Sequence, residues 1–238
     1  FQATLQAMKA GGNPALLAIT TVFSSIITLI AFLKAKWVVL TRDYLLSKPW
    51  FTLLWVALFT LGAIIPLEFL YEHLGLEMDE NTGKLFEGLM KEPWGYVAVD
   101  ILAPLTEEIV FRGAILRSLL DMMSKKNHWV AIMISAAMFG LAHGNTAQFV
   151  NALLMGLLLG WMYYRTKSLV PGILMHWVNN TMAYILANLV PQSDGKLIDL
   201  FGGNEQTVYY AVGFSLCILI PSFIQMIIRL RHKCDFYI

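Results

Sequence analysis

Seven stretches of this chain are apolar over about the length that a helix needs to cross a lipid bilayer. A bilayer core is spanned by about 20 apolar helical residues, whose backbone N–H and C=O groups are bonded within the helix itself. The repetition predicts an all-α, polytopic transmembrane helical bundle of about seven spans, or eight if a further helix precedes Phe1. The stretches are residues 14–35, 50–70, 94–120, 128–143, 146–164, 171–190 and 207–230.

The scarcity of charge favours a membrane protein over a soluble one. Only 14% of the residues are charged and 58% are hydrophobic, whereas an ordinary soluble domain carries about 25% charged residues. The formal net charge is +1, so no nucleic-acid-binding surface is indicated. The two cysteines, Cys217 and Cys234, lie apart without a CxxC motif. They predict neither a disulfide framework nor a thiolate metal site.

The lysines and arginines predict how the bundle is oriented. They cluster near residues 34–48, 117–126, 165–167 and 229–233, and seven crossings put all four clusters on one face. The positive-inside rule makes that face cytoplasmic, together with the C-terminus. The expected location is the inner (plasma) membrane of the cell, with the lipid bilayer as a partner.

We expect one integral membrane domain with three parts along the chain. Residues 1–93 hold the first two spans and an extracytoplasmic segment, 94–190 hold the polar side chains described below, and 191–238 hold the last span and a basic tail. In the first part, residues 78–92 are too polar to cross a bilayer. They predict either a short interfacial helix or a connecting loop.

Two glutamates and an arginine lie within the apolar stretch 94–120. Glu108 and Arg112 are four residues apart, so they share a helix face and are predicted to form an ion pair. Glu107 points about 100° away from Glu108 around the helix, and it has no partner three or four residues distant. An unpartnered carboxylate at membrane depth marks a candidate functional site, and a carboxylate is suited to act as a general base.

Two residues that precede Glu107 bear on its surroundings. Asp100 lies seven residues earlier, so it is expected on roughly the same helix face, as a structural or water-access residue. Pro104 has no N–H group, and in an α-helix it would leave the carbonyl of Asp100 without a donor. A kink with some water is therefore expected near this position.

Two histidines and an asparagine lie in neighbouring apolar stretches. His143 follows Phe139 by four residues, and His176 precedes Asn180 by four. Each polar group is costly alone in lipid, so we expect them to meet Glu107 in one pocket. Carboxylate and imidazole together can activate a water molecule, and a second imidazole with an amide can donate hydrogen bonds to an oxyanion. This set of groups suits peptide-bond hydrolysis without a side-chain nucleophile.

Straight, full-length helices would keep the two histidines apart. His143 lies near the outer end of its predicted helix, whereas His176 lies about 5 residues, or roughly 7 Å, from the cytoplasmic start of its own. Their meeting requires a short or recessed helix 128–143, followed by a turn at Gly144 and Asn145. Irregular backbone of this kind is tolerated in a membrane where it lines a cavity.

Three motifs in this region resemble those of the CPBP family, the CAAX-protease and bacteriocin-processing endopeptidases, also called the Abi family. The EExxxR motif is matched by EEIVFR at 107–112, FxxxH by FGLAH at 139–143, and HxxxN by HWVNN at 176–180. The motifs occur in the family's order, and the resemblance covers about residues 94–190.

The resemblance implies an intramembrane glutamic endopeptidase that uses no metal and no other cofactor. Glu107 would act as general base together with His143. His176 and Asn180 would stabilise the oxyanion of the tetrahedral intermediate. The residues implied to support the site are Glu108, Arg112 and Phe139.

The resemblance also implies the class of substrate. Eukaryotic and archaeal members remove the last three residues of prenylated CAAX proteins, and many bacterial members act on other peptides, including bacteriocins. The expected partner is therefore a peptide or protein C-terminal substrate, prenylated in some members of the family.

Other functions stay open from the residues alone. Glu107, His143 and His176 are types of side chain that ligate zinc, although the chain has no HExxH motif. Buried carboxylates and histidines also form proton relays in transporters, although no inverted repeat of broken helices is visible. A non-hydrolytic immunity or scaffold protein would keep the same motifs.

Overall fold

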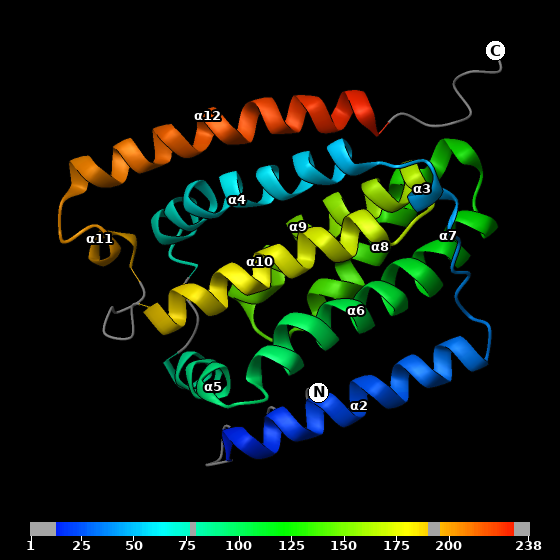
Figure 1. Ribbon diagram of the computed structural model, residues 1–238, viewed down its shortest axis with the longest axis horizontal. Coiled ribbons are helices and arrows are strands. Elements are labelled where there is room, and N and C mark those ends of the chain that lie inside the picture. The colour runs from blue at the N-terminus through cyan, green and yellow to red at the C-terminus, as the bar shows by residue number, and fades with distance from the viewer. Residues whose placement is uncertain (1–12, 77–79, 190–195, 231–238) are drawn as a thin grey trace.

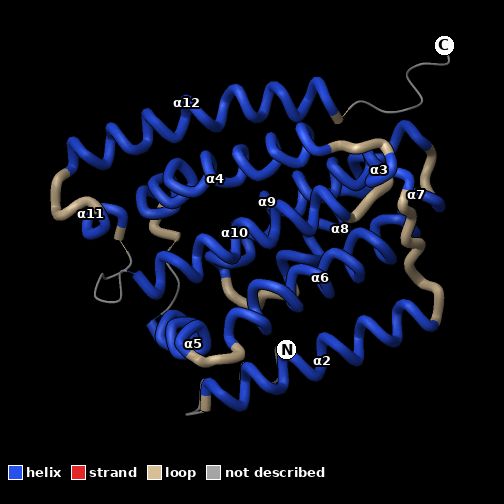
Figure 2. Tube along the Cα trace, in the orientation of Figure 1, coloured by secondary structure: helices blue, strands red, loops and turns tan. Residues whose placement is uncertain are grey.

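A computed structural model of the chain describes residues 13–76, 80–189 and 196–230. These residues form helices and no strand (Figure 2). Residues of the predicted basic tail beyond 230, Cys234 among them, lie outside the described part. The helices are α2 (Pro14–Lys34), α3 (Asp43–Leu46), α4 (Trp50–His73), α5 (Glu80–Lys91), η1 (Val97–Leu102), α6 (Ala103–Glu107), η2 (Glu108–Leu116), α7 (Arg117–Met122), η3 (Lys125–Asn127), α8 (His128–Leu141), α9 (Thr146–Thr166), α10 (Val170–Leu189), α11 (Leu197–Leu200) and α12 (Glu205–Arg229).

Each of the seven apolar stretches is helical, and four of the helices are long and apolar enough to cross a membrane. These four are α2, α4, α9 and α12. The predicted all-α fold is confirmed for the described residues, whereas the number of crossings stays a prediction. Helix α8 has only 14 residues, or about 21 Å at 1.5 Å per residue, less than the roughly 30 Å of a bilayer core.

The helices form a bundle in which most long axes run along its length (Figure 1). Helix α12 packs against α4, and α10 packs against α4 on the inner side. Helices α8 and α9 form a second closely packed pair, and α2 packs against η1 and α6 at the opposite edge. This order puts α6, η2 and α10, the helices that carry polar motif residues, between apolar neighbours.

The two ends of the bundle differ in character. The C-terminal ends of α2 and α12, the short helix α3 and helix α7 lie at one end, whereas α5 and α11 lie at the other (Figure 1). The predicted basic clusters at 34–48 and 117–126 therefore gather at a single end. This arrangement agrees with the one-sided charge distribution on which the predicted orientation depends.

Of the two structures predicted for residues 78–92, the helix is the one observed over the described residues 80–91. Helix α5 turns Leu85 and Leu89 toward Leu17 and Ala18 of α2, where the four residues form a small buried cluster. The charged pair Glu87 and Lys91 is exposed, as expected for an amphipathic helix at a membrane surface.

Close contact between α8 and α9 depends on glycine. A Cβ atom on Gly156 of α9 would lie 2.9 Å from the Cβ atom of Ala136 and 3.3 Å from Nη2 of Arg112. On Gly160, a Cβ atom would lie 2.9 Å from a methyl group of Ile132. Both glycines therefore let α8 and α9 pack closely, and Gly156 also brings α9 against the arginine of the EExxxR motif.

Replacing Gly156 by alanine is expected to destabilise the protein by about 1–3 kcal/mol, because a well-packed interface must shift to admit one methyl group. The measurement is the midpoint of thermal or denaturant unfolding in detergent. Gly213→Ala in α12 is the matched control, since a Cβ atom there meets nothing within 4 Å. An equal loss of stability in both variants would contradict the packing argument.

Candidate active site

The EExxxR motif lies on one uninterrupted helical segment that runs from η1 to α7. Two parts of it, η1 and η2, have the wider π-helical turn. A π-helix bonds each N–H to the carbonyl five residues back, and such turns occur frequently at functional sites. In η1 the N–H of Ala103 donates to the carbonyl of Ala98. The sequence predicted a helix over 94–120 but not its π-helical turns.

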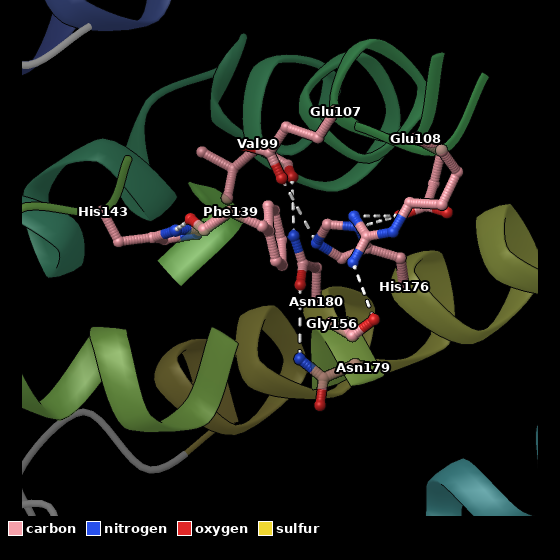
Figure 3. Close-up of polar contacts among 10 residues, drawn as sticks. Val99, Glu107, Glu108, Phe139, His143, Gly156, His176, Asn179 and Asn180 are labelled. Carbon is pink, nitrogen blue, oxygen red and sulfur yellow. Dashed lines mark hydrogen bonds and ion pairs between the residues drawn. The ribbon is translucent and has the colours of Figure 1, made fainter. Parts of the chain in front are cut away.

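The π register moves the backbone defect caused by Pro104. In this register the donor for the carbonyl of Val99 would be the N–H of residue 104, which proline lacks. The Nδ2 group of Asn180 donates to that carbonyl instead, at 3.0 Å (Figure 3). The predicted orphan was the carbonyl of Asp100, so this detail was wrong by one residue. The motif asparagine therefore couples α10 to the defect in η1.

The π-helical turn of η1 also places Asp100 differently from the prediction. Its side chain is 1% exposed and does not belong to the lining of the cavity that contains Glu107. A wider turn changes the angle per residue, so seven residues no longer return to the same face. Asp100 is therefore buried away from Glu107.

Glu108 and Arg112 form the predicted ion pair, with Oε1 and Nη1 2.9 Å apart. Both side chains are buried. Arg112 Nη2 also donates to the carbonyl of Gly156 at 3.4 Å, and its guanidinium lies 4.4 Å above the ring of Phe139. Gly172 of α10 makes room for the carboxylate, since a Cβ atom there would lie 2.6 Å from Glu108 Oε2. This pair ties η2 to α8, α9 and α10.

Glu107 is more exposed than its neighbour, with 30% of its side chain accessible. Its Oε2 atom lies 3.5 Å from Nε2 of His176. The other ring nitrogen of His176 lies 3.7 Å from Oε1 of Glu108. The buried imidazole thus lies between the two carboxylates of the motif and orients toward Glu107 (Figure 3).

His143 approaches the site from the end of α8. Its Nδ1 atom lies 2.9 Å from the carbonyl oxygen of Phe139. Its ring packs edge-to-face with the Phe139 ring, and the two ring centroids are 4.8 Å apart. The centroid of the Phe139 ring also lies 5.8 Å from that of the His176 ring. The Phe139 ring therefore separates the two imidazoles (Figure 3). The expected short helix is observed, since α8 ends at Leu141 and Gly144 has a φ of 76°.

All four predicted catalytic side chains line one cavity of about 520 Å³. Glu107 enters it from α6, His143 from the end of α8, and His176 with Asn180 from α10. The imidazole nearest to Glu107 is that of His176, whereas His143 lies on the far side of Phe139 (Figure 3). The other polar side chains of the lining are Thr106, Gln148, Asn151, Asn179 and four hydroxyl residues of α2.

Some members of this lining were not predicted. Asn179 donates to Oδ1 of Asn180 at 3.3 Å. In the sequence, only its position next to Asn180 could have indicated that it belongs to the site. The hydroxyl residues of α2 had a stronger signal, because they recur at helical spacing within a largely apolar stretch. Within the described residues, no three His, Cys, Asp or Glu side chains gather as metal ligands would.

Comparisons with known proteins agree with this arrangement. A family model described as "Type II CAAX prenyl endopeptidase Rce1-like" matches residues 90–182. "Putative membrane peptidase YdiL" of Bacillus subtilis (strain 168) is 28% identical over 153 residues, which are 62% of this chain and 61% of that protein. "Membrane-embedded CAAX protease MroQ" of Staphylococcus aureus (strain USA300) is 30% identical over 150 residues, which are 61% and 60% of the two chains. These matches support the resemblance of this chain to the CPBP family.

The segment that the family model matches is the part of the chain that carries the site. It contains Glu107, His143, His176 and Asn180 together with their supporting residues. The alignments span about 60% of the length of the two curated relatives. No solved structure matches the chain. The similarity to membrane peptidases and the four long apolar helices among the described residues support an integral membrane protein.

Proposed function

We propose that this protein is an intramembrane endopeptidase that hydrolyses a peptide bond with water activated by Glu107. One observation carries the proposal. The Glu107 carboxylate lies 3.5 Å from His176, within a cavity that also holds His143 and Asn180. A partly accessible carboxylate among hydrogen-bonding groups is the arrangement that general-base catalysis requires.

In the proposed reaction, Glu107 takes a proton from water as the water oxygen attacks the scissile carbonyl carbon. The same proton passes to the leaving amine when the C–N bond breaks, so the carboxylate is regenerated. His143 assists from across the cavity. Its Nδ1 atom faces the carbonyl of Phe139 at 2.9 Å, so that nitrogen carries the proton and Nε2 is left as an acceptor.

The tetrahedral intermediate needs donors for its oxyanion, and α10 supplies them in this proposal. His176 offers a ring N–H beside Glu107. The amide of Asn180 has two N–H groups, of which one donates to the carbonyl of Val99 and the second is left for the oxyanion. Removing one such donor typically slows an enzyme about 10²- to 10³-fold.

The proposed substrate is a peptide or a protein C-terminus that reaches the cavity from the membrane. One relative is named a CAAX protease, and this supports CAAX-type peptides, with leader or bacteriocin-type peptides as the other class. The proposed topology has seven crossings and a cytoplasmic C-terminus, in keeping with the basic residues at one end of the bundle.

The proposal predicts cleavage of peptides by purified protein in detergent, mapped by mass spectrometry over a library that includes farnesylated CAAX peptides. Cleavage is expected to persist after treatment with EDTA or 1,10-phenanthroline, because the proposed mechanism uses a carboxylate in place of a metal. Loss of cleavage with chelator and its return with added zinc would establish the zinc alternative. A protein that cleaves no peptide in the library would favour the non-hydrolytic alternatives.

A further inference from the structure

Helix α2 carries four hydroxyl side chains on one face, within a sequence that is largely apolar. They are Thr21, Ser24, Ser25 and Thr28, at positions i, i+3, i+4 and i+7. Residues at this spacing lie on the same side of an α-helix. All four line the cavity that contains Glu107.

Three of these hydroxyls have no hydrogen-bond partner among the described residues. Ser and Thr in membrane helices usually donate to a carbonyl one turn back, as Thr20 does toward Leu16 at 2.8 Å and Ser24 toward Thr21 at 3.1 Å. Thr21 and Ser25 are 7% and 6% exposed, and neither they nor Thr28 form such a bond within the described part of the chain. A buried polar group without a partner is costly, so the face is suited to a ligand.

The opposite wall of the cavity repeats the spacing. Ala103, Thr106, Glu107 and Val110 line it from α6 and η2, again at i, i+3, i+4 and i+7. The hydroxyl oxygen of Thr106 is buried and has no hydrogen-bond partner within the part of the chain that the structure describes. Helix α2 packs against η1 and α6, so the hydroxyl face and the Glu107 face bound the same space.

We propose that the hydroxyl face of α2 binds the backbone of the substrate next to the scissile bond and holds it extended in front of Glu107. This inference rests on the proposed function. A peptide bond inside a helix has its carbonyl already bonded, so a segment must unwind before water can attack it. Its freed N–H and C=O groups then need partners in an apolar environment.

Hydroxyl groups meet that need without selecting a side chain. Each one can donate to a carbonyl or accept from an N–H. From Thr21 to Thr28 the helix rises roughly 10 Å at 1.5 Å per residue, which matches about three residues of extended chain at 3.3 Å each. The site therefore recognises a short extended peptide backbone of broad sequence.

The test removes the hydroxyls without changing the shape of the cavity, in Thr21→Val, Ser25→Ala, Thr28→Val and the triple variant. The probes are the library peptides that the wild-type protein cleaves. Each single change is expected to raise KM about fivefold, the effect of losing one net hydrogen bond, while kcat changes less than about twofold. Thr20→Val is the matched control, because its hydroxyl bonds its own helix and lies outside the cavity lining, and it is expected to leave KM unchanged.

N-methylated peptides identify the backbone groups that are bound. Methylation of an N–H that contacts the hydroxyl face is expected to weaken binding to the wild-type protein but to have no further effect on the triple variant, as in a double-mutant cycle. Wild-type KM in the triple variant would overturn the inference. A fall in kcat at constant KM would also overturn it, because that result indicates a role in the chemical step or in structure.

Binding measurements separate this inference from the proposed function. In a Glu107→Gln background, fluorescence anisotropy of labelled library peptides, whether or not the wild-type protein cleaves them, reports binding without hydrolysis. If the wild-type protein cleaves nothing but the triple variant loses affinity in this background, the proposed function fails and the peptide site stands. If no library peptide binds, or if the triple change leaves affinity intact, the peptide site is rejected whatever the activity.

Discussion

Replacing Glu107 by glutamine is expected to lower kcat for peptide cleavage by roughly 10²- to 10⁴-fold, the usual contribution of a general base. Glutamine keeps the size of the side chain and can still hydrogen-bond to His176, which lies 3.5 Å away. It cannot accept a proton from water at neutral pH. The measurement is the steady-state rate on the peptide identified by mass spectrometry, with the unfolding midpoint recorded in the same detergent.

The control for this change is Glu87→Gln in α5, where the side chain is 44% exposed. This variant is expected to retain wild-type kcat, because residue 87 is not part of the cavity lining. The Glu107→Gln protein should also unfold close to the wild-type midpoint, since its carboxylate belongs to no buried pair with Arg112. Wild-type kcat in Glu107→Gln would reject the assignment of the base.

Replacing Glu108 by glutamine is expected to destabilise the protein by about 3–5 kcal/mol, because it leaves a buried guanidinium without its counter-charge. Arg112 is 0% exposed and Glu108 is 1% exposed, so water cannot take the place of the lost partner. The measurement is the free energy of unfolding in a denaturant titration. Glu107 and Glu108 are neighbours in the sequence, yet we expect Glu108→Gln to act on stability and Glu107→Gln to act on catalysis.

A paired replacement distinguishes the ion pair from simple packing. In the double variant Glu108→Leu with Arg112→Met, no charge is left unpaired, and such replacements of buried ion pairs are often neutral or stabilising. We expect the double variant to recover most of the stability lost in Glu108→Gln. A double variant at least as unstable as the single one would show that the contacts of Arg112 with Gly156 and Phe139 matter more than its charge pair.

Contacts within one helix were predictable from the sequence. The spacing of Glu108 and Arg112 was enough to predict their ion pair, which the structure has at 2.9 Å. The contact between Phe139 and His143, also four residues apart, likewise spans only the last turn of α8 and the residues that follow it. Helical geometry sets these pairs locally, so they need no knowledge of the rest of the fold.

The π-helical turns show where local reasoning failed. An α-helical register put Asp100 on the face of Glu107 and the orphan carbonyl at residue 100. The observed register moves Asp100 out of the cavity and leaves the carbonyl of Val99 for Asn180. The partner of that carbonyl comes from α10, about 80 residues later, so only tertiary packing reveals it.

By itself, the sequence determined the helical class, the resemblance to a family and the polar residues that each helix contributes, because these depend on apolar length and helical spacing. Only the tertiary structure decided that His176 rather than His143 lies beside Glu107, and that the hydroxyl face of α2 shares their cavity. The physical reason is that periodicity defines the faces of one helix, whereas the pairing of faces depends on side-chain packing between distant segments.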